Sequence, residues 1–551
     1  MSDETKAMTY IYMDLPCFFP SALSACPTRF LLTISISPTQ SQQFNSDFYS
    51  SRRNPRSPIV ILSTLITFRL QLRMSGKAEL VFIPGPGVGH LLSAVEMAKL
   101  LVGRDEGLSV TVLVMKLTDS SDMNSIADSV SASSSTGRIR FIELPRAELQ
   151  NGSPSLVSFL NAVEAYKSHV RDVVRGLADS GSGSASPRLA GFVVDMFCAP
   201  MIDVANEFSV PSYLFFTSSA TFLGAMLHLQ ALQDDCQQDI GALVDSEATV
   251  DYPGLANPLN IKLYMPSELR KKDISSLFLG LAKRFRETKG IVVNTFEELE
   301  QRAVEAVFDD KLPLLYPVGP ILTLKGGSDD KLGSGDIVKW LDDQPPESVL
   351  FLCFGSMGSF REDQVRQIAH ALERSVHRFL WSLRRPPPGG KFDVPQSYDD
   401  PNEVLPEGFL ERTAGQGKVI GWAPQVEVLA HPAVGGFVSH CGWNSTLESI
   451  WFGVPVAAWP MYAEQHFNAY ALVEELGVAV EIRMDYRKGD EVTVTAEEIE
   501  RGIRRLMETE REDKKEKVRL MSEKSRRALM EGGSSHSNLG RFIKDVYNNI
   551  P

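Results

Sequence analysis

The sequence predicts an α/β protein with two facing doubly wound domains and a cleft between them. Apolar, strand-like runs alternate with helical patterns from Leu80 to Phe216, and a second alternating set begins at Ser348. Such alternation is typical of parallel sheets that helices cover on both faces. The segment 317–336, rich in Gly, Ser and Asp, is predicted to be the linker. All six tryptophans follow this segment, so the two halves also differ in composition.

Composition indicates an ordinary globular enzyme. The chain has 551 residues, of which 43% are hydrophobic and 23% charged, and this length favours two or more domains. A net charge of −13 argues against a nucleic-acid partner. No apolar run reaches the roughly 20 residues that a membrane-spanning helix needs. The six cysteines show no zinc or Cys-x-x-Cys spacing, so we expect a reduced cytoplasmic protein. We also expect a monomer and no metal site.

The segment 422–465 carries the densest set of chemically informative residues. Within it, a short apolar run leads through a turn at 439–442 to a helical pattern at 444–451. The first N–H groups of a helix lack partners within the helix, and the helix dipole is positive at that end. Gly442 allows an anion to approach the backbone closely. The turn is therefore a candidate phosphate site.

Side chains around this turn suit the other parts of a nucleotide-diphosphate sugar. Glu448 lies one helical turn after Asn444, where a carboxylate can accept two hydrogen bonds from ribose hydroxyls. Trp422 offers a flat surface on which a base can stack. Trp443 and the pair 464–465 supply an aromatic ring, a carboxylate and an amide for a hexose. Together these residues predict a donor site for glycosyl transfer.

Residues 422–465 resemble, over their full length, the signature box of the plant secondary-metabolite UDP-glycosyltransferases, and the resemblance extends over roughly 78–548. It implies two Rossmann-like domains in the arrangement called GT-B, with UDP-glucose as co-substrate and no further cofactor. In the family, Gln at the last box position and Trp at the position of Trp443 go with glucose. The donor-binding residues that the resemblance implies are Ser356, Trp422, Ala423, Gln425, His440, Gly442, Trp443, Asn444, Ser445, Glu448, Glu464 and Gln465.

By the same resemblance these side chains divide among the parts of the donor. Trp422 and Gln425 would contact uracil, and Glu448 would hold the ribose. The diphosphate would be held by His440, Asn444, Ser445 and Ser356. The sugar would be held by Trp443, Glu464 and Gln465.

A glycine-rich turn in the first half carries a histidine. Residues 79–84 are predicted to be a buried strand, and the turn at 85–90 leads into a helical run at 91–101. Rossmann dinucleotide sites also use such a turn. Here the spacing is not Gly-x-Gly-x-x-Gly, and no clear acid ends the next strand at 110–114, so a dinucleotide site is the weaker interpretation.

His90 and Asp195 lie at the carboxyl ends of two predicted strands, where open parallel sheets bind ligands. In the family, a histidine at the position of His90 is the general base that deprotonates the acceptor, and an aspartate occupies the position of Asp195. That carboxylate would fix the imidazole tautomer and stabilise the imidazolium. From the residues alone, a helix-capping histidine and an N-cap aspartate remain open alternatives.

These parts predict one direct displacement. An acceptor oxygen deprotonated by His90 attacks the anomeric carbon opposite UDP, which inverts the α-linked donor to a β-glucoside. The sequence contains no Asp-x-Asp, the arrangement with which many metal-dependent glycosyltransferases hold a divalent ion. We therefore predict transfer that needs no metal.

The acceptor is expected to be a small lipophilic metabolite. The stretch 189–198 resembles the branch of the family that glucosylates flavonoids, other phenolics, terpenoids and abscisic acid. Flavonoids or other phenolics are the first expectation, and a terpenoid or abscisic-acid-type acceptor is the alternative. The candidate acceptor residues, mostly apolar or aromatic, are Gly87, Met196, Phe197, Phe216, Thr217 and Tyr264. Phe197 and Phe216 are equally compatible with a purely structural place in the core.

The predicted organisation has five parts. Residues 1–73 precede the usual start of the family and are predicted to be a leader, disordered or loosely packed, with a targeting segment as the alternative. Residues 74–316 form the acceptor-binding domain and 337–530 the UDP-sugar-binding domain. Residues 531–551 carry a helix that returns to the first domain.

Three other functional classes are weaker. A nucleotide-sugar 2-epimerase shares the two-domain architecture and lacks the signature box. A non-catalytic UDP-sugar-binding protein would keep the box and lose the base, whereas this chain has both His90 and Asp195. A serine hydrolase is disfavoured because no Gly-x-Ser-x-Gly elbow occurs.

Overall fold

The structure is a computed structural model, and the chain forms two compact units, 1–75 and 76–551. In the first unit, β1 (Ala7–Asp14) pairs antiparallel with β2 (Arg29–Ile36); the rest of the leader predicted at 1–73 lies outside the described residues. The described residues are 7–14, 29–36, 77–116, 137–146, 156–180, 187–266, 269, 271–307, 312–324, 334–387, 395–486 and 492–550.

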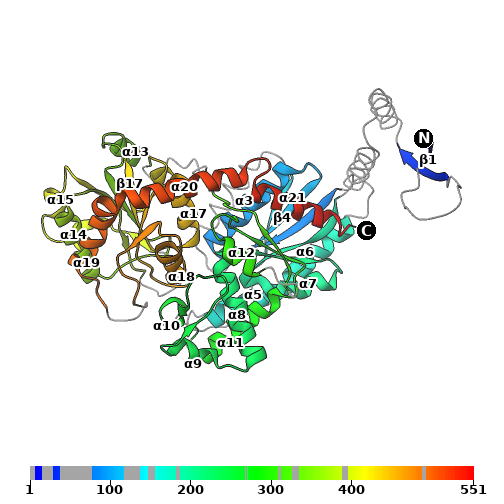
Figure 1. Ribbon diagram of the computed structural model, residues 1–551, viewed down its shortest axis with the longest axis horizontal. Helices are drawn as coiled ribbons and strands as arrows, with labels where there is room; N and C mark the ends of the chain where they lie inside the picture. The colour runs from blue at the N-terminus through cyan, green and yellow to red at the C-terminus, as the bar shows by residue number, and fades with distance from the viewer. Residues whose placement is uncertain are drawn as a thin grey trace, which may run out of the picture. The chain divides into compact units, whose positions relative to one another are not determined.

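The second unit contains two parallel sheets, each with helices packed against it (Figure 1). Over the described residues, the first sheet has seven strands in the order β11-β10-β7-β6-β3-β4-β5, all parallel. Its strands are β3 (Ala78–Ile83), β4 (Leu108–Val114), β5 (Ile139–Glu143), β6 (Arg188–Asp195), β7 (Ser212–Phe216), β10 (Gly290–Val293) and β11 (Leu314–Pro317).

The second sheet is also parallel, and in the described part of the chain it has six strands in the order β16-β13-β12-β17-β18-β19. Its strands are β12 (Val349–Cys353), β13 (Arg378–Ser382), β16 (Gly417–Ile420), β17 (Val434–Ser439), β18 (Val456–Ala458) and β19 (Ala479–Glu481). Two short antiparallel pairs accompany the sheets: β8 (Thr249–Val250) with β9 (Leu259–Asn260), and β14 (Arg384–Arg385) with β15 (Gln396–Ser397).

Helices connect the parallel strands, as parallel pairing requires. In the first half they are α3 (Val88–Arg104), α5 (Leu156–Ala165), α6 (Lys167–Ser180), the 3-10 helix η1 (Met196–Met201), α7 (Ile202–Glu207), α8 (Ala220–Cys236), α9 (Ile240–Asp245), α10 (Ile261–Tyr264), α11 (Lys272–Phe285) and α12 (Gln301–Val307). In the second half they are α13 (Ser334–Asp342), α14 (Glu362–Ser375), η4 (Pro401–Glu403), α15 (Phe409–Arg412), α16 (Gln425–Leu429), α17 (Trp443–Phe452), α18 (Gln465–Tyr470), the π-helical turn η5 (Ala471–Glu475), α19 (Ala496–Arg504), the π-helical turn η6 (Arg505–Thr509), α20 (Arg511–Leu529) and α21 (Ser534–Tyr547).

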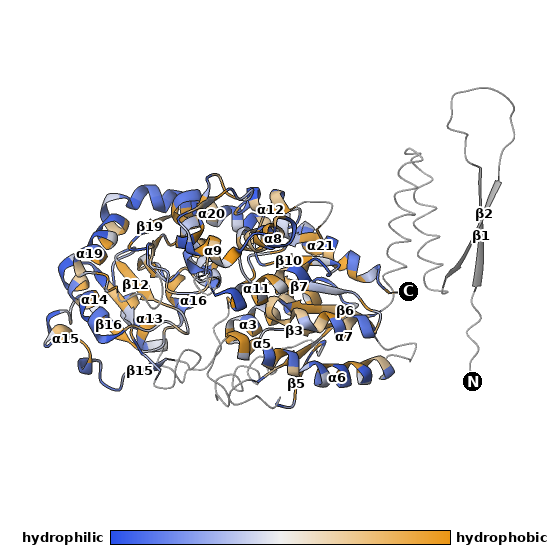
Figure 2. Ribbon diagram, turned by 90° about the horizontal axis from the view of Figure 1, so that it is seen from below, coloured by the Kyte–Doolittle hydropathy of each residue, from blue (hydrophilic) through white to orange (hydrophobic). Residues whose placement is uncertain are grey.

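The second sheet is buried on both faces. Successive side chains of a strand point to opposite faces, so Val349 and Phe351 of β12 join one apolar cluster while Leu350 and Leu352 join another. This explains why its strands are continuous apolar runs in the sequence. Figure 2 shows these apolar strands in the interior and polar surfaces on α14 and α20.

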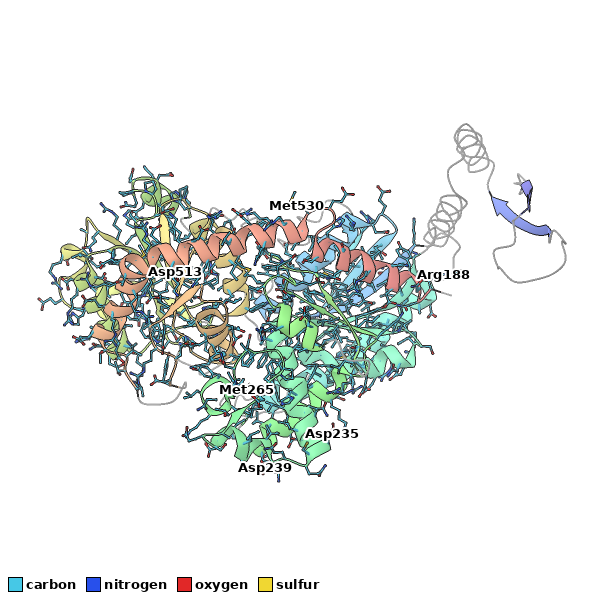
Figure 3. All side chains as sticks on the ribbon, in the orientation of Figure 1. Arg188, Asp235, Asp239, Met265, Asp513 and Met530 are labelled. Carbon is cyan, nitrogen blue, oxygen red and sulfur yellow. The ribbon has the colours of Figure 1, made fainter. Side chains whose placement is uncertain are left out.

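The C-terminal helices link the two halves. Asp513 and Met530 mark the course of α20, which packs against α17 of the second half (Figure 3). The following helix, α21, packs against β11 of the first sheet. Its Phe542 is fully buried and lies edge-on to Tyr213 and Tyr316, with ring centroids 5.0 and 5.5 Å away. The last helix in the sequence therefore completes the core of the first half.

Several predicted boundaries move. The helix predicted at 91–101 begins at Val88, so His90 lies in its first turn rather than before it. The predicted linker 317–336 starts inside the edge strand β11 and ends inside α13, and 325–333 lie outside the described residues. The membrane prediction concerned apolar runs; in the part of the chain that the structure describes, no helix is long and apolar enough to cross a bilayer.

Candidate active site

The predicted site residues gather where each sheet reverses its winding. In the first sheet, β3 and β6 are neighbours while their sequence successors run outward in opposite directions, and β12 and β17 have the same relation in the second. Loops at such a switch point diverge and leave room for a ligand beyond the strand ends. His90 and Asp195 follow or end β3 and β6, while Ser356 and His440 follow β12 and β17.

His90 and Asp195 form a hydrogen-bonded pair. Nδ1 of His90 lies 2.7 Å from Oδ2 of Asp195, which is buried, and 29% of the histidine side chain is exposed. Because a carboxylate only accepts, Nδ1 carries the proton and Nε2 presents a lone pair. The other oxygen of Asp195, Oδ1, accepts the backbone N–H of Phe197 at 3.0 Å and caps η1. The aspartate is therefore both an N-cap and the partner of His90, the two interpretations that the sequence left open.

Two further groups influence the imidazole. Burial lowers the pKa of His90, but the charge and hydrogen bond of Asp195 and the charge of Glu464 together raise it above the ordinary value. Thr217, predicted only as an acceptor contact, places its hydroxyl oxygen 3.1 Å from Nδ1 of His90. Glu464 comes from the second half of the chain, so both halves shape the basicity of this histidine.

The turn before α17 forms a cradle around His440. A Cβ atom at Gly355 or at Gly442 would lie 2.5 or 2.6 Å from Nε2 of His440, so both positions need glycine. Gly442 is the N-cap of α17 and makes no side-chain cap bond, which leaves the first N–H groups of the helix available to an anion. The exposed Ser356 follows Gly355 in the facing loop. The strand, the turn and the uncapped helix start lie as the sequence predicted, and their use as a phosphate site stays a prediction.

His440 is uncharged in this setting. Burial lowers its pKa to about 4, and its Nδ1 is buried with no hydrogen-bond partner among the described residues. A neutral imidazole donates one hydrogen bond and accepts one. His440 can therefore donate to a phosphate oxygen and contributes no positive charge of its own.

Gln425 connects two other predicted donor residues. Its amide Nε2 donates to Oγ of Ser445 at 2.8 Å and to Oε2 of Glu448 at 2.6 Å. Burial raises the pKa of Glu448 to about 7, although the bond from Gln425 lowers it. Oε1 has no bond from Gln425, so it is the oxygen placed to accept from a ligand. The carboxyl group changes its charge in the physiological range.

Trp422 presents a supported aromatic surface. The guanidinium carbon of Arg384 lies 5.0 Å from the centroid of its ring, a cation–π contact, and 42% of Trp422 is exposed. Arg384 itself is buried and donates to the carbonyl of Pro395. Ala423, which follows Trp422, is buried in the core, so only its backbone can reach a ligand. No local pattern in the sequence pointed to Arg384, which is 38 residues from Trp422.

For two residues predicted to contact the sugar, Trp443 and Gln465, the structure limits which atoms can reach a ligand. The indole of Trp443 is a core side chain, and its Nε1 donates to the carbonyl of Asn294 at 2.7 Å. Its ring therefore cannot face a sugar in this arrangement, and only its backbone N–H, at the start of α17, remains available. Oε1 of Gln465 accepts the backbone N–H groups of Met461 and Tyr462 at 2.9 and 3.0 Å, and its amide group also hydrogen-bonds the phenol of Tyr462. An amide nitrogen carries two N–H groups, so one of them remains for a ligand.

Side chains of the two halves meet beside these groups. Oγ of Ser218 donates to Oε1 of Glu464 at 3.0 Å, and Nδ2 of Asn444 lies 3.5 Å from Oγ of Ser93 on α3. The starts of α3 and α17 therefore face each other. Sequence reasoning missed Ser218, although it follows the end of β7 much as Asp195 ends β6.

The candidate acceptor residues divide into two groups. Phe197 is half-buried and lies edge-on to His90 at 5.5 Å, with Phe159 of α5 behind it at 5.4 Å. Gly87 caps α3, beside His90. By contrast, Phe216 is fully buried and contacts two phenylalanines of the core, which corrects its assignment as a contact residue.

The remaining two candidates lie at different depths. Met196 is buried in the first-sheet core directly after Asp195. Tyr264 is half-buried and packs on Tyr470 of α18, with ring centroids 4.7 Å apart. Tyr470 belongs to the second half but is part of the first-sheet core cluster. The surroundings of the candidate acceptor residue Tyr264 are therefore built partly from the second half.

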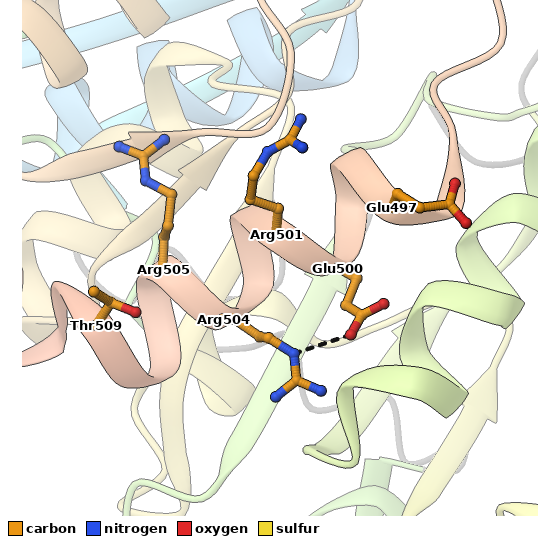
Figure 4. A pocket seen from close by; sticks show the side chains of 6 residues that line it. All are labelled: Glu497, Glu500, Arg501, Arg504, Arg505 and Thr509. Atoms are coloured by element: carbon orange, nitrogen blue, oxygen red, sulfur yellow. Dashed lines mark hydrogen bonds and ion pairs between the residues drawn. The ribbon is translucent and has the colours of Figure 1, made fainter.

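A surface hollow lies elsewhere, on α19 and η6 (Figure 4). It contains none of the predicted site residues, and Arg504 and Arg505 pair with carboxylates four or five residues away in the sequence. In the described part of the chain, no group of three or more His, Cys, Asp or Glu side chains is placed to hold a metal ion.

Comparison with known proteins identifies the family. A protein-family model described as UDP-glucoronosyl and UDP-glucosyl transferase matches residues 295–524. UDP-glycosyltransferase 71A15 of Malus domestica is 55% identical over 480 residues, which cover 86% of this chain and 100% of that protein. A putative UDP-glucose flavonoid 3-O-glucosyltransferase 3 of Fragaria ananassa is 55% identical over 486 residues, with the same coverage.

Solved structures of similar proteins also belong to plant UDP-glycosyltransferases. A UGT transferase from Siraitia grosvenorii in complex with UDP has a TM-score of 0.77 and 50% identity, covering 85% of this chain and 100% of its own. UGT71G1 of Medicago truncatula, complexed with UDP-glucose, has a TM-score of 0.74 and 42% identity, covering 86% and 98%. The chain belongs to the plant family 1 UDP-glycosyltransferases, and its two Rossmann-like domains form the GT-B fold.

The pKa of His90 tests the pairing directly. Replacing Asp195 by Asn removes the charge that favours the imidazolium and leaves the burial that opposes it, so we expect the pKa of His90 to fall. Glu464→Gln should cause a smaller fall, because Glu464 contributes least of the three raising effects. NMR titration of ring-labelled histidine, with the His90 signal identified by its loss in His90→Gln, measures both. An unchanged pKa in Asp195→Asn would contradict the pairing.

Proposed function

We propose that this enzyme is an inverting UDP-glucose-dependent glucosyltransferase that makes β-glucosides of small lipophilic plant metabolites, with flavonoids and other phenolics as the first acceptors. One observation carries the proposal. Asp195 orients His90 so that the neutral imidazole has its lone pair on Nε2. His90 belongs to the first half, and the uncapped start of α17 in the second half faces the helix that carries His90. A proton acceptor and an anion-binding helix start on opposite sides of one site are what sugar transfer from a nucleotide diphosphate requires.

The donor is proposed to lie along the second sheet. Uracil stacks on Trp422, and the ribose hydroxyls donate to the carboxylate of Glu448. The diphosphate sits at the start of α17, held by backbone N–H groups and by the side chains of His440, Asn444 and Ser445, with Ser356 on the facing loop. Glu464 accepts from the sugar hydroxyls and the Nε2 of Gln465 donates to them.

Transfer proceeds in one displacement. The acceptor hydroxyl gives its proton to Nε2 of His90, and its oxygen forms a bond to the anomeric carbon. The bond between that carbon and the β-phosphate oxygen breaks, and the electron pair leaves with UDP. Asp195 stabilises the imidazolium, while the helix start stabilises the anionic UDP. Because attack and departure occur on opposite faces, the α-linked donor yields a β-glucoside, and His90 loses its proton to solvent afterwards.

The acceptor class rests on two supports. Phe197 and Phe159 form an apolar, edge-on aromatic array beside His90, which suits a flat ring better than a sugar. The Fragaria ananassa relative carries the name of a flavonoid 3-O-glucosyltransferase. The sequence has no Asp-x-Asp, with which many metal-dependent glycosyltransferases hold a divalent ion, and on this ground we propose transfer without a metal.

Mass spectrometry of reaction mixtures tests the activity. The purified full chain is incubated with UDP-glucose, EDTA and a panel of flavonoids, simple phenolics, phenolic acids and terpenoids. We expect a one-hexose mass gain on flavonoids or other phenolics, with a β-linkage shown by the coupling between H1 and H2 of the sugar. Gain only on terpenoids would replace the acceptor class, an α-linkage would reject inversion, and binding of UDP-glucose without any product would favour a non-catalytic binding protein.

His90→Ala separates chemistry from binding. Loss of the base should lower kcat roughly 100- to 10,000-fold. Affinity for UDP-glucose, measured by calorimetry, should stay nearly intact, because the imidazole meets the acceptor and not the nucleotide. Lys99→Ala, an exposed-face change on the same helix, is the matched control and should leave both values unchanged. Unchanged turnover in His90→Ala would remove His90 from the role of base.

Affinity for UDP-glucose should weaken as the pH falls through about 7. The pKa of Glu448 is raised to about 7, and the ribose hydroxyls donate to its charged form, so protonation competes with binding. Below this pH the affinity should fall by up to about tenfold per pH unit, and above it the affinity should level off. Calorimetry from pH 6 to 8.5 measures the slope. Glu448→Gln should bind more weakly and without this slope; an equal slope in that variant would assign the titration to another group.

A further inference from the structure

Asn468 of α18 is a buried amide with both ends engaged. Only 1% of its surface is exposed. Nδ2 donates to the backbone carbonyl of Cys441 at 3.0 Å, and Oδ1 accepts from the hydroxyl of Ser219 at 3.4 Å. A carbonyl only accepts, so the amino end of Asn468 must face Cys441 and the oxygen must face Ser219. The amide therefore bridges the donor turn of the second half and the first half.

Cys441 has an unusual backbone. It lies between His440 and Gly442, and its φ is +61°, in the left-handed region that non-glycine residues rarely adopt. Such a conformation persists only where its surroundings hold it. Ser439 holds one side, since its Oγ accepts the N–H of Cys441 at 3.1 Å. Asn468 holds the other side through the carbonyl. The direction of the imidazole of His440 and of the start of α17 depends on this turn.

The other end of the bridge is equally fixed. Ser219 caps α8, because its Oγ accepts the N–H of Phe222 at 3.1 Å while its hydroxyl proton is directed to Asn468. The neighbouring Ser218 donates to Glu464, which lies four residues before Asn468 at the start of α18. Two adjacent serines of the first half thus bind two residues of one helical turn in the second half.

We propose that Asn468 is a positioning residue that holds the donor turn in its left-handed conformation and links that conformation to the apposition of the two halves. The inference rests on the proposed donor site and adds to it a residue that touches neither donor nor acceptor. Asn468 acts through the backbone of Cys441, which orients His440 and Gly442 toward the diphosphate.

Binding of UDP to the purified full chain, measured by calorimetry, tests this role. Asn468→Ala removes the hydrogen bond to the Cys441 carbonyl, and we expect UDP to bind about tenfold more weakly. The control is Asn538→Ala. Asn538 lies on α21 and is also a buried amide, and its Nδ2 donates to the backbone carbonyl of Pro317. That variant should lower Tm and keep the UDP affinity within about twofold, because α21 lies outside the donor site.

A rescue variant distinguishes positioning from a merely structural role. Glycine adopts positive φ freely. In the double variant Asn468→Ala with Cys441→Gly, the turn at 439–442 therefore depends less on the lost hydrogen bond from Asn468. The double variant should bind UDP several-fold more tightly than Asn468→Ala. Wild-type affinity in Asn468→Ala, or no recovery in the double variant, would overturn the proposal. Failure of the wild-type chain to bind UDP would overturn the donor site itself. Should Asn468→Ala not fold, Asn468→Ser and its own Cys441→Gly double variant take its place, with the same outcomes.

Discussion

The active site depends on two helix starts held face to face by side chains from both halves of the chain. Neither half carries the whole candidate site: His90 and Asp195 lie on the first sheet, and the turn proposed to bind the diphosphate lies on the second. What holds them in register is a small number of polar contacts and the burial of Phe467 and Tyr470 of α18 in the core of the first half. Phe467 lies edge-on to Phe222 of α8 at 5.7 Å. Apolar burial gives this interface its strength, while the hydrogen bonds give it direction.

Charge in the site is controlled by burial more than by local partners. His440 and Glu448 are both drawn toward their neutral forms because the site excludes water, and only Glu448 has a side-chain partner that opposes the shift. His90 is the exception, because two carboxylates from different halves raise its pKa against burial. In the proposed reaction, the base on one side of the site is strengthened, while His440 on the other side is neutral, so backbone dipoles at the start of α17 would stabilise the leaving diphosphate.

The sequence predicted those parts of the fold and site that short segments encode. Apolar runs ending in Asp195 or in the 439–442 turn correctly indicated parallel strands, and the glycine after His440 correctly indicated a helix start. Contacts between distant segments left no such signal. Arg384 behind Trp422 depends on how distant segments of the second half pack. Ser218 beside Glu464 and the indole of Trp443 against Asn294 depend on how the two halves pack, and no local pattern specifies either kind of packing. For the same reason the aromatic Trp443 was assigned to the sugar when its ring belongs to the core.

The path of the last two helices has a consequence for how the protein is made. Phe542 of α21 packs against the rings of Tyr213 and Tyr316 on the first sheet. The hydroxyl of Tyr547 donates to Asp105, which follows α3. On the ribosome, residues 78–317 emerge long before α21 and must wait with this edge uncovered while the second half is synthesised. The first half is thus translated first, and its core is completed only after α21 has been made.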